Sequence, residues 1–80
     1  MKTYKYYLPG YIGDADDPYE FKGYTPWSSD ELAEYAAEDF YFNHDGWEDK
    51  WPLTFCVLLD GEWITHKVDR EAVPSFYVVG

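Results

Sequence analysis

The chain has 80 residues, enough for one small domain and too few for two. Sixteen Asp and Glu against six Lys and Arg give a net charge of −10, which argues against direct binding to DNA, RNA or an anionic membrane. Aromatic residues make up 22% of the chain, whereas highly charged disordered segments are poor in aromatics. We therefore expect a single folded domain over residues 1–80.

The first strand and a long loop are predicted at the start of the chain. Residues 3–8 are rich in β-forming residues, and Pro9 and Gly10 end this run. Residues 10–27 are acidic and are interrupted by glycines and prolines, so they predict one long connection. Connections of this length are uncommon inside a compact domain and are usually functional.

The only strong helix signal follows this loop. Ser28 and Glu31 have the Ser-x-x-Glu spacing of a capping box, which predicts a helix that ends near residues 42–43. Spacing of i, i+3, i+4 and i+8 predicts its buried face, made of Leu32, Tyr35, Ala36 and Phe40.

Two strands joined by a tight turn are predicted next. Residues 52–59 form an apolar run that suits a central strand. An Asp-Gly pair at 60–61 is the signal of a two-residue hairpin, and residues 62–68 alternate as its second strand.

The last strand is predicted over residues 72–79, at a sheet edge or with a bulge because Pro74 interrupts it. The expected element order is β-α-β-β-β. One helix packed on a small antiparallel sheet gives a two-layer α+β fold.

The negative charge is concentrated in one part of the chain. Residues 14–49 hold twelve acids and one base, for a net −11, and the remaining residues carry a net +1. Within the helix, Asp30, Glu34 and Glu38 form a stripe at i, i+4 and i+8 (the acidic stripe), with no Lys or Arg in the helix to pair with it. Like charges at this spacing cost about 0.2–0.5 kcal/mol per pair.

Two interpretations of this charge stay open. An acidic surface keeps an aromatic-rich protein soluble, but charges of magnitude about 2–8 are enough for that. We favour a docking surface for a basic partner, because the charge is larger and is confined to one half of the chain. The predicted partner-binding residues are Asp14, Asp16, Asp17, Glu20, Asp30, Glu31, Glu34, Glu38, Asp45, Trp47, Glu48 and Asp49.

Two tryptophans lie among the acids that follow the helix. We expect Trp51 to pack beneath the sheet, because a core this small needs large rings. For Trp47, a structural role and an exposed contact with a partner both stay open, since Trp is enriched at the centres of protein interfaces.

Residues 14–25 have part of the pattern of a calcium-binding loop. Asp14, Asp16 and Glu20 offer oxygen ligands, but Tyr19 and Thr25 stand where such a loop needs glycine and glutamate. We therefore expect an acidic turn here and no cation site.

His44, His66 and Cys56 are the remaining residues that could bind zinc or carry out thiol chemistry. His44, His66 and Cys56 lack the short paired spacing of zinc ligands. Cys56 lies in the most apolar strand, where a thiol is usually buried and inert, although the hairpin places His66 on the neighbouring strand. As the only cysteine, Cys56 also excludes an internal disulfide. We expect no metal, no cofactor and no enzymatic activity.

A resemblance rests on two segments of the second half of the chain. Residues 44–55 read HDGWEDKWPLTF and residues 73–77 read VPSFY. Together they resemble a group of short uncharacterised bacterial and phage-borne proteins that share DGWE-x-x-WPL. This resemblance covers residues 32–78 and implies no activity. In size and charge the chain is also similar in general character to phage anti-CRISPR inhibitors of the DNA-mimic type, which assigns no functional residue.

The expected function is that of a small inhibitor that acts by binding. Its partner would be a basic nucleic-acid-binding protein or complex, with a CRISPR effector complex favoured, and the inhibitor would be a monomer or a weak homodimer. Residues 1–17 lack the apolar core of a signal peptide, so we expect a cytoplasmic protein, in the host cytoplasm if a phage encodes it. The alternative is an intracellular interaction domain whose acidity serves solubility.

Overall fold

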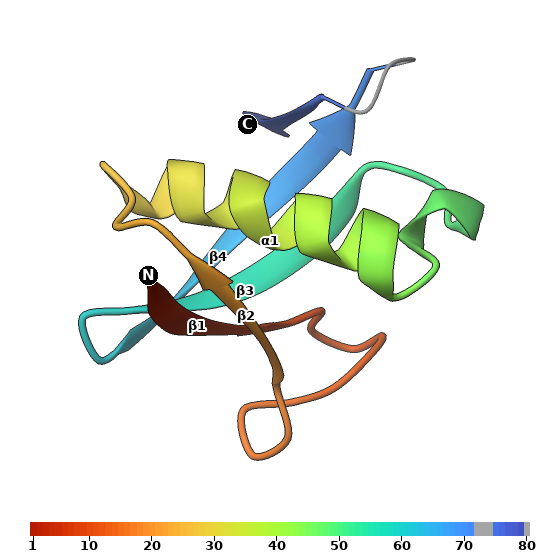
Figure 1. The fold of residues 1–80 in the computed structure, drawn as a ribbon. Helices are drawn as coiled ribbons and strands as arrows, with labels where there is room; N and C mark the ends of the chain where they lie inside the picture. The colour runs from red at the N-terminus through yellow and green to blue at the C-terminus, as the bar shows by residue number, and fades with distance from the viewer. Residues whose placement is uncertain (72–74, 80) are drawn as a thin grey trace.

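One α-helix and five strands make up the fold of residues 1–71 and 75–79, which the computed structural model describes (Figure 1). The helix α1 (Ser29–Asn43) covers one face of an antiparallel sheet, and the short 3-10 helix η1 (Gly46–Glu48) follows it. The expected two-layer α+β fold is confirmed. The sheet has the order β2-β1-β3-β4-β5, with strands β1 (Lys2–Tyr7), β2 (Tyr19–Gly23), β3 (Leu53–Leu59), β4 (Glu62–Arg70) and β5 (Phe76–Val79).

Strand β2 is the main departure from the sequence analysis, which placed residues 10–27 in one loop. That prediction was wrong at residues 19–23, and the element order is β-β-α-β-β-β. Tyr19 and Phe21 alternate with charged residues and pair with Tyr6 and Tyr4 of β1, at ring-centre distances of 5.5 and 6.0 Å. The neighbouring proline and glycines concealed this short alternating pattern.

Both ends of α1 are capped by hydrogen bonds. The Ser28 Oγ accepts a hydrogen bond from the Glu31 amide at 3.4 Å, so the predicted start is confirmed. The Glu31 carboxylate accepts from the Trp27 amide at 3.0 Å, one residue before the usual partner of a capping box. At the other end, the His44 amide donates to the Phe40 carbonyl at 3.1 Å.

The predicted hairpin between β3 and β4 is confirmed. Asp60 and Gly61 have φ values of 52° and 81°, the left-handed conformations that a type I′ turn requires. The final strand β5 pairs with β4 at one edge of the sheet, as expected. The predicted residues 72–74, including Pro74, lie outside the described residues.

The core lies between α1 and the sheet. The helix contributes Leu32, Ala33, Ala36, Ala37 and Phe40, all fully buried. Tyr35 of the predicted buried face is only half-buried, because the small side chains of Ala33 and Ala37 bring the other side of the helix against the sheet. The sheet contributes Tyr4, Tyr6, Phe55, Val57 and Val68.

Candidate partner-binding surface

The acidic stripe of α1 is open to solvent. Asp30 and Glu38 are exposed and Glu34 is half-buried. In the described part of the chain, no carboxylate lies within 4.0 Å of a Lys or Arg nitrogen, and both ion pairs present involve histidine. These pairs are His66 Nε2 with Asp30 at 3.3 Å, and His44 Nε2 with Asp39 at 3.6 Å. Among the described residues, the carboxylates of Glu34 and Glu38 have no such partner, so their charges are left for an external partner or for solvent.

Other predicted acids serve the fold. The Asp14 carboxylate accepts hydrogen bonds from the amides of Asp16 and Asp17, both at 2.9 Å, and so closes the turn before β2. Glu31 caps α1 through the Trp27 amide. These two carboxylates have partners within the chain, whereas the side chains of Asp16 and Asp17 extend from an exposed turn.

The turn after α1 meets the loop that follows β1. The Tyr11 hydroxyl donates a hydrogen bond to the Asp49 carboxylate, which joins segments 38 residues apart in the sequence. Glu48 and Asp49 therefore lie near the β1–β2 connection. By contrast, Glu20 lies on the sheet face away from α1, opposite Lys5 of β1.

The two tryptophans of this turn have different surroundings. Trp51 is half-buried, stacks on Phe55 at a ring-centre distance of 5.8 Å, and donates from Nε1 to the Gly46 carbonyl at 3.0 Å. The packing role predicted for Trp51 is confirmed. Trp47 is 55% exposed, which favours the second of its two interpretations, a side chain free to contact a partner.

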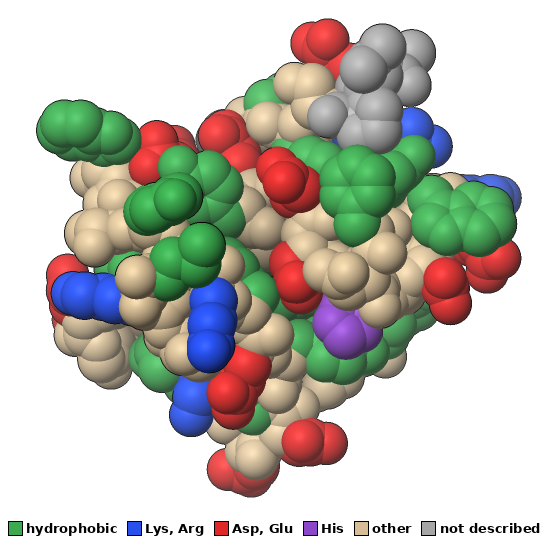
Figure 2. All heavy atoms as spheres, in the orientation of Figure 1, with side chains coloured by type: hydrophobic (Ala, Val, Ile, Leu, Met, Phe, Trp, Pro, Cys, Tyr) green, Lys and Arg blue, Asp and Glu red, His purple; other side chains and the backbone are tan. Residues whose placement is uncertain are grey.

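Large aromatic side chains lie exposed on the same side as α1. Trp27 is 93% exposed, Tyr24 71% and Phe42 62%. Figure 2 shows carboxylates interspersed with hydrophobic side chains over the face on which α1 lies, with Lys and Arg side chains among them at the lower left and others at the edges. These three aromatics were not predicted from the sequence, although Phe42 lies outside the i, i+3, i+4 spacing of the buried face and could have been identified from it.

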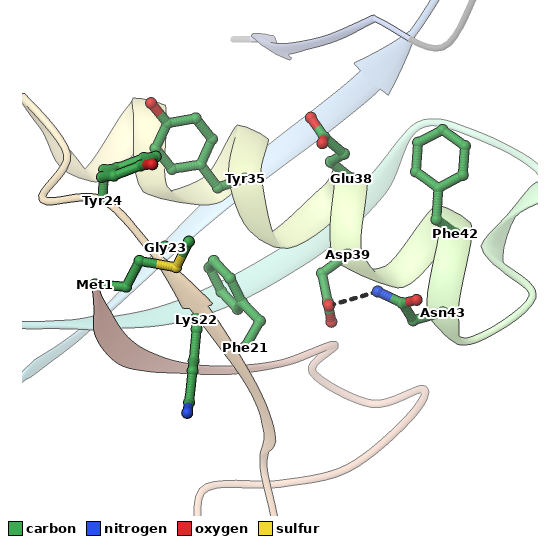
Figure 3. Close-up of a pocket in the computed structure, with 10 residues that line it drawn as sticks. All are labelled: Met1, Phe21, Lys22, Gly23, Tyr24, Tyr35, Glu38, Asp39, Phe42 and Asn43. Carbon is green, nitrogen blue, oxygen red and sulfur yellow. Dashed lines mark hydrogen bonds between the residues drawn. The ribbon is translucent and has the colours of Figure 1, made fainter.

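A groove of about 480 Å³ runs between α1 and β2 (the α1–β2 groove). Figure 3 shows Tyr24 and Tyr35 at one end of it, with Phe42 and Asn43 at the other. Its lining residues are Met1, Phe21, Lys22, Gly23, Tyr24, Tyr35, Glu38, Asp39, Phe42 and Asn43. This groove was not predicted from the sequence, because it depends on strand β2, which was not predicted either.

Two tyrosine hydroxyls respond to the carboxylates of α1. Burial and the hydrogen bond to Asp39 raise the pKa of Tyr6 far above its usual range. Loss of solvation is the largest cause that raises the pKa of Tyr35, and the hydrogen bond to Glu31 and the charges of Glu31, Glu34 and Glu38 raise it further. The carboxylates of α1 thus add to a pKa shift that burial dominates.

The predicted neighbours Cys56 and His66 lie on opposite faces of the sheet. Cys56 is 3% exposed on the open face, where Thr65 donates to its Sγ at 3.7 Å. His66 faces α1, and its Nε2 lies 2.8 Å from the Ser29 Oγ and 3.3 Å from Asp30. A serine triad needs its carboxylate at Nδ1 of the histidine, whereas both contacts here are made by Nε2, so the three residues do not form such a triad. The contacts instead join α1 to β4.

No group of three His, Cys, Asp or Glu residues gathers at a metal-binding distance in the described residues. The helices described there also include none long and apolar enough to cross a membrane. A comparison of the chain with models of protein families finds no match, and comparisons with curated proteins and with solved structures find none either.

Proposed function

We propose that this protein binds a basic, nucleic-acid-binding surface of another protein and thereby excludes the nucleic acid. One observation carries the proposal. The acidic stripe has no Lys or Arg partner among the described residues, and exposed aromatics adjoin it in the sequence, with Phe42 in the last turn of α1 and Trp27 just before the N-cap. An acidic surface interleaved with aromatics suits a partner rich in Arg and Lys, since both pair with carboxylates and stack on rings.

The spacing of the acidic stripe bears on the mimicry of DNA. Residues four apart on a helix are separated by about 6 Å along its axis, so the stripe carries a charge every ~6 Å. One strand of DNA carries a charge every ~3.4 Å. The stripe alone has about half that density, so the proposal includes the acids of the turns at residues 14–17 and 45–49 as further contacts.

We expect the exposed aromatic side chains to supply most of the binding free energy. Charged pairs at the rim of an interface mainly accelerate association, while buried aromatic side chains provide most of the binding free energy. Trp27, Phe42 and Trp47 each expose more than half of their surface. We expect them to become buried when the partner docks.

A CRISPR effector complex is the partner that we would test first, and the host cytoplasm is then the site of action. This choice rests on the small size and high acidity of the chain and on its general likeness to phage anti-CRISPR inhibitors. The resemblance of residues 32–78 to short bacterial and phage-borne proteins also stays a prediction.

The test is displacement of labelled target DNA from purified CRISPR effector complexes, measured by fluorescence anisotropy. We expect displacement at a stoichiometric ratio in about 50 mM salt and a much weaker effect in about 300 mM salt, because salt screens the exposed charges. Catalytic inactivation at a low molar ratio, or binding that leaves DNA in place, would contradict the proposal.

A second candidate rests on the open face of the sheet. Tyr7 and Trp63 pack edge to face there at a ring-centre distance of 5.1 Å, and no helix covers them. If this face binds the partner, the chain is an interaction domain whose acidity serves solubility. Trp63→Ala would then abolish binding, and salt would have little effect.

A further inference from the structure

The α1–β2 groove has the size and shape of a site for a single side chain or small molecule. Its volume of about 480 Å³ falls within the ~300–1,000 Å³ typical of ligand pockets. Strand β2 forms one side of the groove and α1 the other, so both sides belong to regular elements (Figure 3).

Aromatic rings dominate the lining. Phe21 is half-buried and lies between β2 and α1, while Tyr24 and Tyr35 lie together at one end. The opposite end carries Phe42, which is 62% exposed. Ring faces attract a cation placed within about 6 Å of their centres.

Two carboxylates of α1 also line the groove. The Asp39 oxygens are held by the Tyr6 hydroxyl at 2.7 Å and by the Asn43 amide at 2.9 Å, so the orientation of this carboxylate is fixed. The neighbouring Glu38 is exposed. Lys22 is the one Lys or Arg of the lining, and Figure 3 shows its side chain directed away from both carboxylates.

We propose that the α1–β2 groove binds one arginine side chain of a protein partner. The guanidinium would stack on the aromatic lining and donate two hydrogen bonds to the exposed Glu38 carboxylate. Asp39 would add negative charge only, because consecutive residues of a helix do not face each other and its oxygens already accept from Tyr6 and Asn43. Arginine fits better than lysine because its flat guanidinium stacks on rings, pairs with carboxylates through two hydrogen bonds, and is more weakly hydrated. The same chemistry occurs elsewhere in the chain, where the Arg70 guanidinium carbon lies 5.4 Å from the centre of the Tyr41 ring.

This inference rests on the proposed function for the nature of the partner, a basic protein surface. The lining of the groove by itself does not distinguish an arginine of a protein from a free small cation. The exposed acidic stripe continues beyond the groove along α1, with Asp30 two turns away from Glu38, and this continuity favours a protein that presents several cations.

The first experiment is an NMR titration of the ¹⁵N-labelled protein with acetyl-Gly-Arg-Gly-amide. Peptides with lysine or with citrulline in place of arginine are the controls, since citrulline has nearly the same shape without the charge. We expect shifts at Tyr24, Asp39 and Asn43, including the Asn43 side-chain amide, with the arginine peptide binding several-fold more tightly than both controls. Equal shifts from the lysine peptide, or shifts spread along α1, would overturn the proposal.

A matched pair of variants tests the position of the site. Glu38→Gln removes a carboxylate that lines the groove, and Glu34→Gln removes one from the same helix outside it. Both change the net charge equally. We expect Glu38→Gln to weaken the arginine peptide about fivefold, a value near the upper range for an exposed ion pair, and Glu34→Gln to weaken it less than about twofold. Equal effects would show general attraction and would overturn the proposal.

The two proposals can fail separately. A protein that displaces DNA from its partner but binds the three peptides equally retains the proposed function and loses the arginine site. A protein that binds the arginine peptide in the groove but displaces no nucleic acid retains the site and loses the proposed function.

Discussion

The hydroxyl of Tyr6 donates a hydrogen bond of 2.7 Å to the carboxylate of Asp39, and this contact joins strand β1 to helix α1. Tyr6 is fully buried, whereas Asp39 lies at the border between the core and the α1–β2 groove. The contact, together with the buried face of α1, holds the helix against the sheet. Asp39 is directed toward β1, while Glu38 of the acidic stripe stays exposed, where a partner can reach it.

Removal of this contact should destabilise the fold. Tyr6→Phe keeps the buried ring but leaves the Asp39 carboxylate without one of its two side-chain donors. We expect a loss of about 2 kcal/mol in the free energy of unfolding, typical of a hydrogen bond to a charged group. Urea denaturation at pH 7 measures it. An unchanged midpoint would show that water replaces the hydroxyl at no cost.

Alkaline conditions should also destabilise the fold. The pKa values of Tyr6, Tyr7, Tyr11, Tyr35 and Tyr77 are all raised in the folded chain. Unfolded tyrosines lose their protons near pH 10, so above this pH the unfolded state binds fewer protons than the folded state. The contribution of these tyrosines to the free energy of unfolding is therefore fully present below about pH 10. It is lost as the pH rises further.

The Tyr6→Phe variant separates the contribution of Tyr6 to this pH dependence. We expect a shallower fall between about pH 10 and pH 12 than in the parent chain, because the most strongly shifted group is gone. Urea denaturation at each pH measures the slope for both chains. Identical slopes would contradict the assignment to Tyr6.

The two tryptophans of the turn after α1 should differ in their contribution to stability. Trp51→Ala removes the stack on Phe55 and the hydrogen bond to the Gly46 carbonyl, so we expect a loss of about 3 kcal/mol. Trp47→Ala removes an exposed side chain and should change stability by no more than about 0.5 kcal/mol. Thermal unfolding of both variants measures the difference, and equal losses would contradict the structure.

Gly46 is the position where a single methyl group should be most costly. A Cβ there would lie 2.6 Å from Phe40 Cδ2 and 2.8 Å from the Phe40 carbonyl oxygen. We expect Gly46→Ala to destabilise the fold by about 2 kcal/mol, as overpacking does. Gly23→Ala is the matched control, because its nearest contact is an ordinary 3.5 Å, and it should change stability by about 0.5 kcal/mol or less.

The sequence was informative where local chemistry decides the structure. Ser28 and Glu31 mark the start of α1, and the Asp60-Gly61 pair forms the turn between β3 and β4. Both were predictable because capping and turn geometry depend on a few adjacent residues. Strand β2 was missed, since only its pairing with β1 reveals that Tyr19 and Phe21 share a face. Tertiary pairing of this kind cannot be read from five residues.

The same limit applied to the candidate surface. The acidic stripe was evident from the i, i+4 spacing on the helix. It was not evident which carboxylates have partners within the fold and which remain free. That difference depends on distant residues, such as Tyr6 for Asp39 and Tyr11 for Asp49. Nor did the sequence indicate the exposure of Trp27 or the α1–β2 groove.

The most direct test of the central proposal is a charge reversal on α1. Glu34→Lys with Glu38→Lys is compared with Glu62→Lys and Glu71→Lys, two exposed acids outside the helix, and each pair changes the net charge equally. The measurement is displacement of labelled DNA from a CRISPR effector complex. We predict that reversal on α1 weakens displacement at least about tenfold and that the control pair weakens it less than about threefold. Equal losses for two folded variants would contradict docking through α1.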